Sequence, residues 1–174
     1  MSILDWLRTA RPETAADQAD TDTVLRIVKE LDKLEPRLGR YLAAFAYVLS
    51  RVAGADRHFS EAETTTMIDL IVELGHLPRA QAILVVEIAK SQNKRFAGTE
   101  DYLVTREFRE IASDEERGAL LDCLFAVAAA DAAISPEEEA QIRQISSELG
   151  FAHADYVNVR LRYSDKRTVL RKDP

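Results

Sequence analysis

One internal repeat constrains the fold of this chain more than any other feature. Residues 53–63 read AGADRHFSEAE and residues 128–138 read AAADAAISPEE, which align at an offset of 75 as Ala-x-Ala-Asp-x-x-(Phe/Ile)-Ser-x-x-Glu. The similarity extends over residues 43–76 and 118–151, where apolar positions and a terminal glycine recur in register. A single helical hairpin cannot bury its own apolar stripe, but two copies can bury each other's. The repeat therefore predicts two related helical hairpins that share one core.

The repeat also carries a signal for the start of a helix. In a capping box, Ser-x-x-Glu, the serine oxygen accepts a hydrogen bond from a free backbone N–H and the glutamate accepts one from the serine N–H. Helices are therefore expected to begin directly after each such serine. The matching pairs are Ser60 with Glu63, Ser113 with Glu116, and Ser135 with Glu138.

Composition favours helices throughout. The chain of 174 residues has only six glycines and five prolines, so it lacks the turn residues that an all-β protein needs. Alanine, leucine, glutamate and arginine fill the long segments, and these are strong helix formers. We expect an all-α bundle of about seven to eight helices and no strand. The segments with helical spacing are 2–10, 22–35, 37–54, 61–75, 78–92, 100–112, 114–131, 136–149 and 153–165.

The chain divides into three parts by composition. Residues 1–22 predict a short amphipathic helix (2–10) followed by a flexible linker with almost no large apolar residue. Residues 23–165 form the helical domain, and residues 166–174 form a basic tail. We expect segment 2–10 to be helical where it finds an apolar groove, on the domain itself or on a protein partner.

Charge is unevenly distributed along the chain. The net charge of −7 and the pI near 5.1 argue against a nucleic-acid binder, which would need cations to neutralise phosphates. From Arg160 onward, however, six basic residues face two acidic ones, so this end carries +4 and the rest −11. Most such basic segments are solvated, and we expect the same here. The alternative is a handle that binds a partner or a phosphate.

Other features bear on the compartment of the protein. Cys123 is the single cysteine, which excludes an intramolecular disulfide and a thiolate metal cluster. The N-terminus lacks the features of a signal peptide, and no run approaches the roughly 18 apolar residues of a spanning helix. We expect a soluble cytoplasmic protein without a transmembrane segment.

The repeated aspartates allow two interpretations. Asp56 and Asp131 each precede the capping glutamate, Glu63 or Glu138, by seven residues. They can accept hydrogen bonds from free N–H groups of the turn, which needs no ligand. Alternatively, all four carboxylates can form an oxygen-rich site for a divalent cation, Ca²⁺ or Mg²⁺, if the two turns lie side by side. Glu61 and Glu137 would then be further candidates.

Several other kinds of site can be set aside. An EF-hand would place a glutamate at the twelfth loop position, where Met67 or Ile142 stands instead. The three histidines, His58, His76 and His153, share no spacing typical of metal ligands. No nucleophile–histidine pair, phosphate-binding glycine loop or HExxH is present. Paired carboxylates could do acid–base chemistry, so an enzyme stays open as the less favoured class.

The doubled motif resembles the TerB-like family, which includes tellurite-resistance proteins and the N-terminal domain of a membrane-anchored co-chaperone. The matching residues are Ala55-Asp56 with Phe59-Ser60 and Glu63, and Ala130-Asp131 with Ile134-Ser135 and Glu138. The resemblance covers about residues 24–160. It departs from the family where Arg57 and Ala132 replace a glycine. No J-domain is present, since the nearest match to its signature is His153-Ala154-Asp155.

This resemblance implies an all-helical, non-enzymatic binding or scaffold domain in a stress-response system such as tellurite resistance. It also implies metal binding by the acidic residues and protein partners in a membrane-associated complex, with the chain peripheral at the inner membrane. A co-chaperone-like or membrane-surface adaptor domain is the alternative, although a helix as short as 2–10 binds lipid only marginally without a second signal.

Overall fold

The computed structural model describes residues 25–53, 60–92, 99–130 and 133–167. These ranges are helical and contain no β-strand, which confirms the expected all-α class. Residues 1–22, with the helix expected at 2–10, lie outside the described residues, as do Asp56 and Asp131. After a helical segment at 25–31, the elements are α3 (Pro36–Val52), α4 (Glu61–Leu74), α5 (Arg79–Gln92), α6 (Thr99–Ile111), α7 (Asp114–Ala129), α8 (Pro136–Glu148), α9 (His153–Leu161) and the 3₁₀ turn η1 (Ser164–Lys166).

The three expected capping boxes are all present, so the starts of α4, α7 and α8 are confirmed. At α4, for example, Glu63 N donates to Ser60 Oγ over 3.2 Å, and Ser60 N donates to Glu63 Oε2 over 2.7 Å. The two repeat copies share this geometry closely, because Ser60 and Ser135 have nearly the same extended backbone angles, −62°, 166° and −73°, 160°.

The helix ends differ more from expectation. Gly75 is the C-cap of α4 but stays right-handed, and His76 takes the left-handed conformation, with φ of 54°. A side chain at Gly75 would meet the carbonyl oxygen of Ile71 at 2.6 Å, so close approach explains this glycine. In the second copy the left-handed residue is Gly150, with φ of 85°. The matching glycines 75 and 150 therefore play different roles.

The predicted helix 153–165 is too long, since α9 ends at Leu161 and the chain then turns through η1. This turn brings the segment back to the residues just before α8, where Ile134 N donates to the Lys166 carbonyl over 2.7 Å. The basic segment is also not simply solvated over residues 160–167. Arg160 and Arg167 both bind Glu139, while Arg162 pairs with Asp122 over 2.7 Å.

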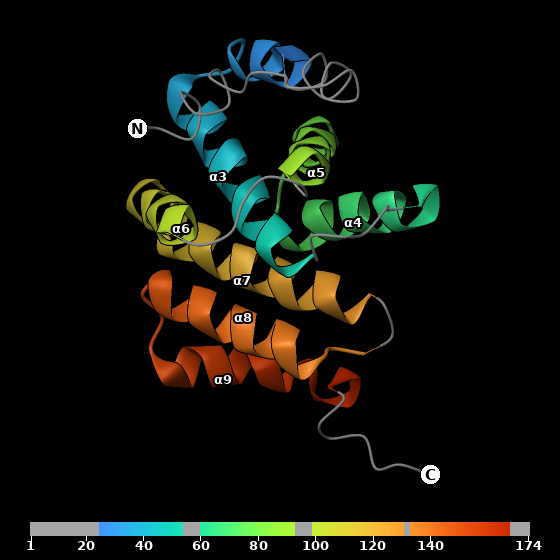
Figure 1. Cartoon of the computed structure of the whole chain (residues 1–174), viewed down its shortest axis with the longest axis vertical. Helices are drawn as coiled ribbons and strands as arrows, with labels where there is room; N and C mark the ends of the chain where they lie inside the picture. The colour runs from blue at the N-terminus through green and yellow to red at the C-terminus, as the bar shows by residue number, and fades with distance from the viewer. Residues whose placement is uncertain (1–24, 54–59, 93–98, 131–132, 168–174) are drawn as a thin grey trace.

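Helix α3 is central to the domain. Residues 41–49 are buried on every side of this helix, which is typical of a core helix rather than a surface helix. Small residues at positions 43, 44 and 46 let neighbouring helices approach closely, and α3 packs against α5, α6, α7 and α8. In Figure 1 it runs between α5 and α6.

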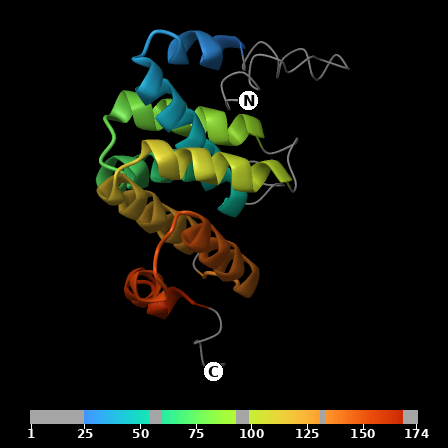
Figure 2. The same ribbon diagram turned by 90° about the vertical axis from the view of Figure 1, so that its left-hand side faces the viewer.

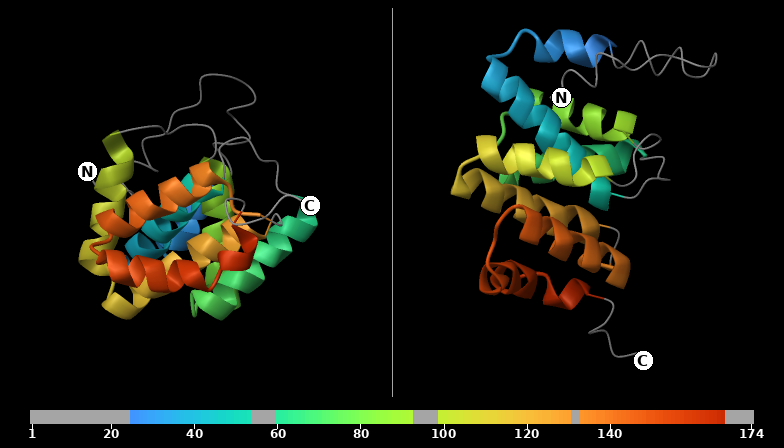
Figure 3. Two further views of the ribbon diagram at one scale, coloured as in Figure 1. Left: turned by 90° about the horizontal axis from the view of Figure 1, so that it is seen from below. Right: turned by 60° about the vertical axis from the view of Figure 1, so that its left-hand side comes forward.

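The second half of the chain extends the bundle away from α3. Helices α7, α8 and α9 lie one beneath the other (Figures 1 and 2). In the second repeat α8 packs back against α7, whereas α4 of the first repeat packs on α5 and α7. Figure 3 shows α4 at the side of the bundle. The two hairpins therefore share one apolar core, as expected, but use different neighbours.

Candidate functional site

A pocket of about 160 Å³ lies where the two repeats meet. It is lined by the last turns of α3 and α7, by the first half of α4 and Leu70, and by the first turn of α8. Its described lining is mostly apolar, with two carboxylates. The residues are Val52, Ala53, Ala62, Glu63, Thr66, Met67, Leu70, Val127, Ala128, Ala130 and Glu138.

Equivalent residues of the two repeats contribute to the lining of this pocket. Three pairs separated by the repeat offset of 75 line it together. Duplication therefore builds not only the core but also a site with contributions from both copies. The pairs are Val52 with Val127, Ala53 with Ala128, and Glu63 with Glu138.

The pocket is not symmetric beyond these pairs. Helix α4 continues along it with Ala62, Thr66, Met67 and Leu70, whereas α8 contributes Glu138 alone. This asymmetry follows from the packing, because α4 lies across α7 while α8 turns back along it. One wall of the pocket is consequently an apolar face of α4.

Both glutamates are held in place by the helix starts that they cap. Glu63 is exposed, and its Oε2 accepts from Ser60 N over 2.7 Å. Glu138 is half-buried, and its Oε2 accepts from both Ser135 N and Ser135 Oγ over 2.9 Å. Because the capping boxes fix these side chains, two carboxylates stand at the pocket without large rotational freedom.

Of the four expected metal ligands, the structure brings Glu63 and Glu138 to one pocket. Asp56 and Asp131 belong to the segments that the structure leaves undescribed. Glu61 and Glu137 are exposed and do not line the pocket. Within the described ranges, no group of three or more His, Cys, Asp or Glu side chains is placed to hold a metal ion.

Sequence reasoning missed a buried ionic network near the pocket. The side chain of Arg51, in the last turn of α3, is only 4% exposed and pairs with Glu148 of α8, and it also donates to Thr105 Oγ1 of α6 over 2.6 Å. The available signal was an arginine within an otherwise apolar helix end, at a position where the second repeat has Ala126.

The helices were compared with membrane-spanning helices, and the sequence with known proteins. Among the described residues, none of the helices has the length and apolar character needed to cross a membrane. A family model described as tellurite resistance protein TerB matches residues 42–161, a span that includes both glutamates of the pocket. No curated protein and no solved structure gives a significant match.

Proposed function

This chain belongs to the TerB family, and from that premise we propose that it is a non-enzymatic helical binding or scaffold domain of a stress-response system. Its ligand at the shared pocket is a divalent cation, Ca²⁺ or Mg²⁺, held between the two acidic turns. The observation that supports this proposal is that Glu63 and Glu138, equivalent residues of the two repeats, line the same pocket.

The two glutamates have the chemistry that a hard cation needs. Carboxylate oxygens are preferred ligands of Ca²⁺ and Mg²⁺, but Ca²⁺ takes six to eight oxygens. Oε2 of each glutamate already accepts a hydrogen bond in its capping box, so these two side chains alone offer too few oxygens to coordinate the cation. We propose that Asp56 and Asp131 complete the site with backbone carbonyls and water, since each lies seven residues before its glutamate.

The capping boxes favour binding over acid–base catalysis. A carboxylate that accepts hydrogen bonds from a helix start is a fixed ligand, whereas a general acid or base must exchange its proton with a substrate. In this proposal the cation links the turns of the two repeats and shapes a surface for protein partners in a membrane-associated complex, with the chain peripheral at the cytoplasmic side.

Thermal unfolding in the presence of Ca²⁺, Mg²⁺, Mn²⁺ or Zn²⁺ tests this proposal. A cation that binds only the folded state stabilises it, by about 2.7 kcal/mol at 100 times Kd. We expect one or more of these ions to raise Tm of the wild-type protein. The double variant Asp56→Asn with Asp131→Asn should lose this shift, and so should Glu63→Gln and Glu138→Gln.

Glu116→Gln is the matched control. Glu116 completes the same capping box at α7 but does not line the pocket. Glutamine can replace glutamate in a capping box, so all three Gln variants keep the cap and lose one charge. The cation-induced shift should survive in Glu116→Gln. A wild-type Tm that none of the four ions moves, or an equal loss in the control, would leave the aspartates and glutamates with a capping role alone.

A further inference from the structure

A second hollow lies on another part of the molecule, between α8 and α9. This α8–α9 groove has a volume of about 630 Å³ and is open to solvent. Figure 1 shows these helices side by side, at the end of the bundle away from the 25–31 helix. Its polar lining consists mainly of Glu139, Arg143, Gln144, Tyr156, Arg160 and Arg167. Glu138 and Glu139 are neighbours in the chain, yet they line different hollows.

The α8–α9 groove is basic on an acidic protein. Three arginines and one glutamate give its lining a net charge of +2, whereas the whole chain carries −7. Arg160 and Arg167 share Glu139, with Arg167 donating to both carboxylate oxygens over 2.7 Å. Glu139 thus aligns two guanidinium groups along one wall. Arg143 is exposed and pairs with no carboxylate of the described residues.

The groove also contains buried polar atoms that lack hydrogen-bond partners. Tyr156 is only 2% exposed, and neither its hydroxyl nor Nε of Arg160 has a partner with good hydrogen-bond geometry among the described residues. Arg160 lies over the Tyr156 ring and can only donate, so the hydroxyl proton has no acceptor among these residues. Such atoms are rare in native proteins, and each calls for an explanation such as a bound ligand. Burial, followed by the charge of Glu139, raises the pKa of Tyr156, so the hydroxyl keeps its proton and can donate.

We propose that the α8–α9 groove is a binding site for an oxyanion, the phosphate or carboxylate group of a small molecule. Guanidinium groups present parallel N–H donors that match both kinds of anion, and a tyrosine hydroxyl adds a further donor. Arg143 and Arg160 supply the charge, while Tyr156 supplies the buried donor. Glu139 holds Arg160 and Arg167 in position and does not contact the ligand.

Calorimetric titration of the full chain with pyrophosphate and with citrate, at constant ionic strength in sodium chloride, tests this site. The two probes distinguish a phosphate ligand from a carboxylate ligand, and binding of either supports an oxyanion site. Arg143→Gln should weaken binding about tenfold, because it removes a charged hydrogen bond. Tyr156→Phe should weaken it by about three- to tenfold, as expected for a neutral donor.

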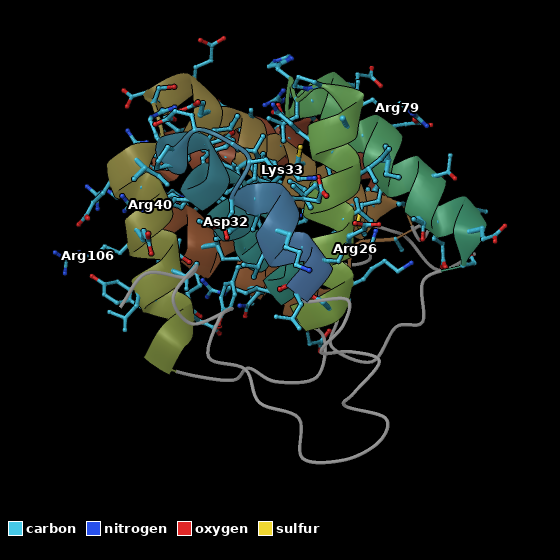
Figure 4. The ribbon with its side chains drawn as sticks, turned by 90° about the horizontal axis from the view of Figure 1, so that it is seen from above. Arg26, Asp32, Lys33, Arg40, Arg79 and Arg106 are labelled. Carbon is cyan, nitrogen blue, oxygen red and sulfur yellow. The ribbon has the colours of Figure 1, made fainter. Side chains whose placement is uncertain are left out.

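Arg106→Gln provides a control with the same change of charge. Arg106 lies on α6, outside the groove lining, with its side chain 61% exposed, and Figure 4 shows it pointing outward at the left-hand edge of the molecule. Its variant should bind the probes like the wild type. Equal weakening by Arg106→Gln would mean general electrostatic attraction and would overturn the proposal, as would the failure of both probes to bind at millimolar concentration.

A stability measurement separates a ligand-binding role of Tyr156 from a structural one. Because its hydroxyl donates to no acceptor among the described residues, Tyr156→Phe should change Tm of the ligand-free protein little, while it should reduce the rise in Tm caused by the better probe. A clear fall in the ligand-free Tm would show that the hydroxyl has a structural partner and would contradict its assignment. Arg143→Gln, at an exposed position, then tests the groove without disturbing the fold.

Discussion

Arg51 and Glu148 form a buried ion pair between residues 97 positions apart, with Nη1 of Arg51 2.6 Å from Oε2 of Glu148. Their side chains are 4% and 9% exposed. Arg51 lies in the last turn of α3 in the first repeat, and Glu148 is the last residue of α8 in the second. Asp101 of α6 adds a weaker contact, 3.7 Å from Arg51 Nε. The pair therefore links the two repeats to each other and to α6.

Removing one partner of this pair should destabilise the protein strongly. Glu148→Gln leaves the guanidinium of Arg51 buried with only the longer contact to Asp101 as ionic compensation. We expect a loss of about 3 kcal/mol in the free energy of unfolding, since an uncompensated buried charge costs several kcal/mol. Urea denaturation measures this loss in the free energy of unfolding. Glu110→Gln, which breaks the exposed pair with Arg106, should cost about 0.5 kcal/mol or less, and an equal cost would contradict the argument.

The same pair predicts how stability depends on pH. Burial alone would raise the pKa of Glu148, but hydrogen bonds from Arg51 and Gln144, together with the charge of Arg51, hold it below its usual value of 4.5. The unfolded chain therefore binds the proton more readily, so the contribution of Glu148 is complete above about pH 4.5 and is lost as pH falls through the lower folded pKa.

The measurable consequence is a difference between wild type and variant that shrinks in acid. The stability of the wild type should exceed that of Glu148→Gln by a constant amount near neutral pH. The gap should narrow as pH falls below the ordinary pKa of a glutamate. Denaturation curves at a series of pH values would show this narrowing of the stability difference. A gap that stays constant down to pH values where the protein unfolds would mean that Glu148 is not held ionised by Arg51.

Two glycines should respond to alanine in opposite directions. Gly118 lies inside α7, and nothing within 4 Å would meet a side chain there. Alanine restricts the unfolded chain and suits a helix, so Gly118→Ala should stabilise the protein by about 0.5–1 kcal/mol. At Gly75 the new Cβ would lie 2.6 Å from the Ile71 carbonyl oxygen, so Gly75→Ala should destabilise it. Thermal unfolding of both variants checks the signs.

Local patterns in the sequence predicted the parts of the fold that depend on nearby residues. The capping boxes at Ser60, Ser113 and Ser135 join residues three positions apart, so each was visible as a motif and each is present. The repeat similarly led us to expect Glu63 and Glu138 near each other, and both line one pocket; a cation there stays a prediction. The roles of Gly75 and Gly150 differ because α4 is one residue longer at its end, which no motif specifies.

Contacts between distant segments could not be predicted in the same way. Arg51 pairs with Glu148 only after the four intervening helices have packed, and the residues beside Arg51 in the chain give no sign of its partner. The basic residues after position 159 likewise read as a solvated segment, because Glu139 and Asp122 come near them only in the folded chain. The α8–α9 groove is assembled by this return of the chain, so it left no motif.

Cys123 offers a direct measure of how the core opens. The thiol is fully buried in α7, and burial, followed by the charge of Asp122, raises its pKa to about 12. At pH 8 roughly one thiol in 10⁴ is then ionised, so the native protein should react very slowly with a disulfide reagent.

If the reagent reaches Cys123 only through global unfolding, the labelling rate follows the unfolding equilibrium. Glu148→Gln, with a loss of about 3 kcal/mol, should then label about a hundredfold faster. Fast labelling of the wild type, or equal rates in both proteins, would mean that Cys123 becomes accessible through a local opening of α7 that leaves the Arg51–Glu148 pair intact.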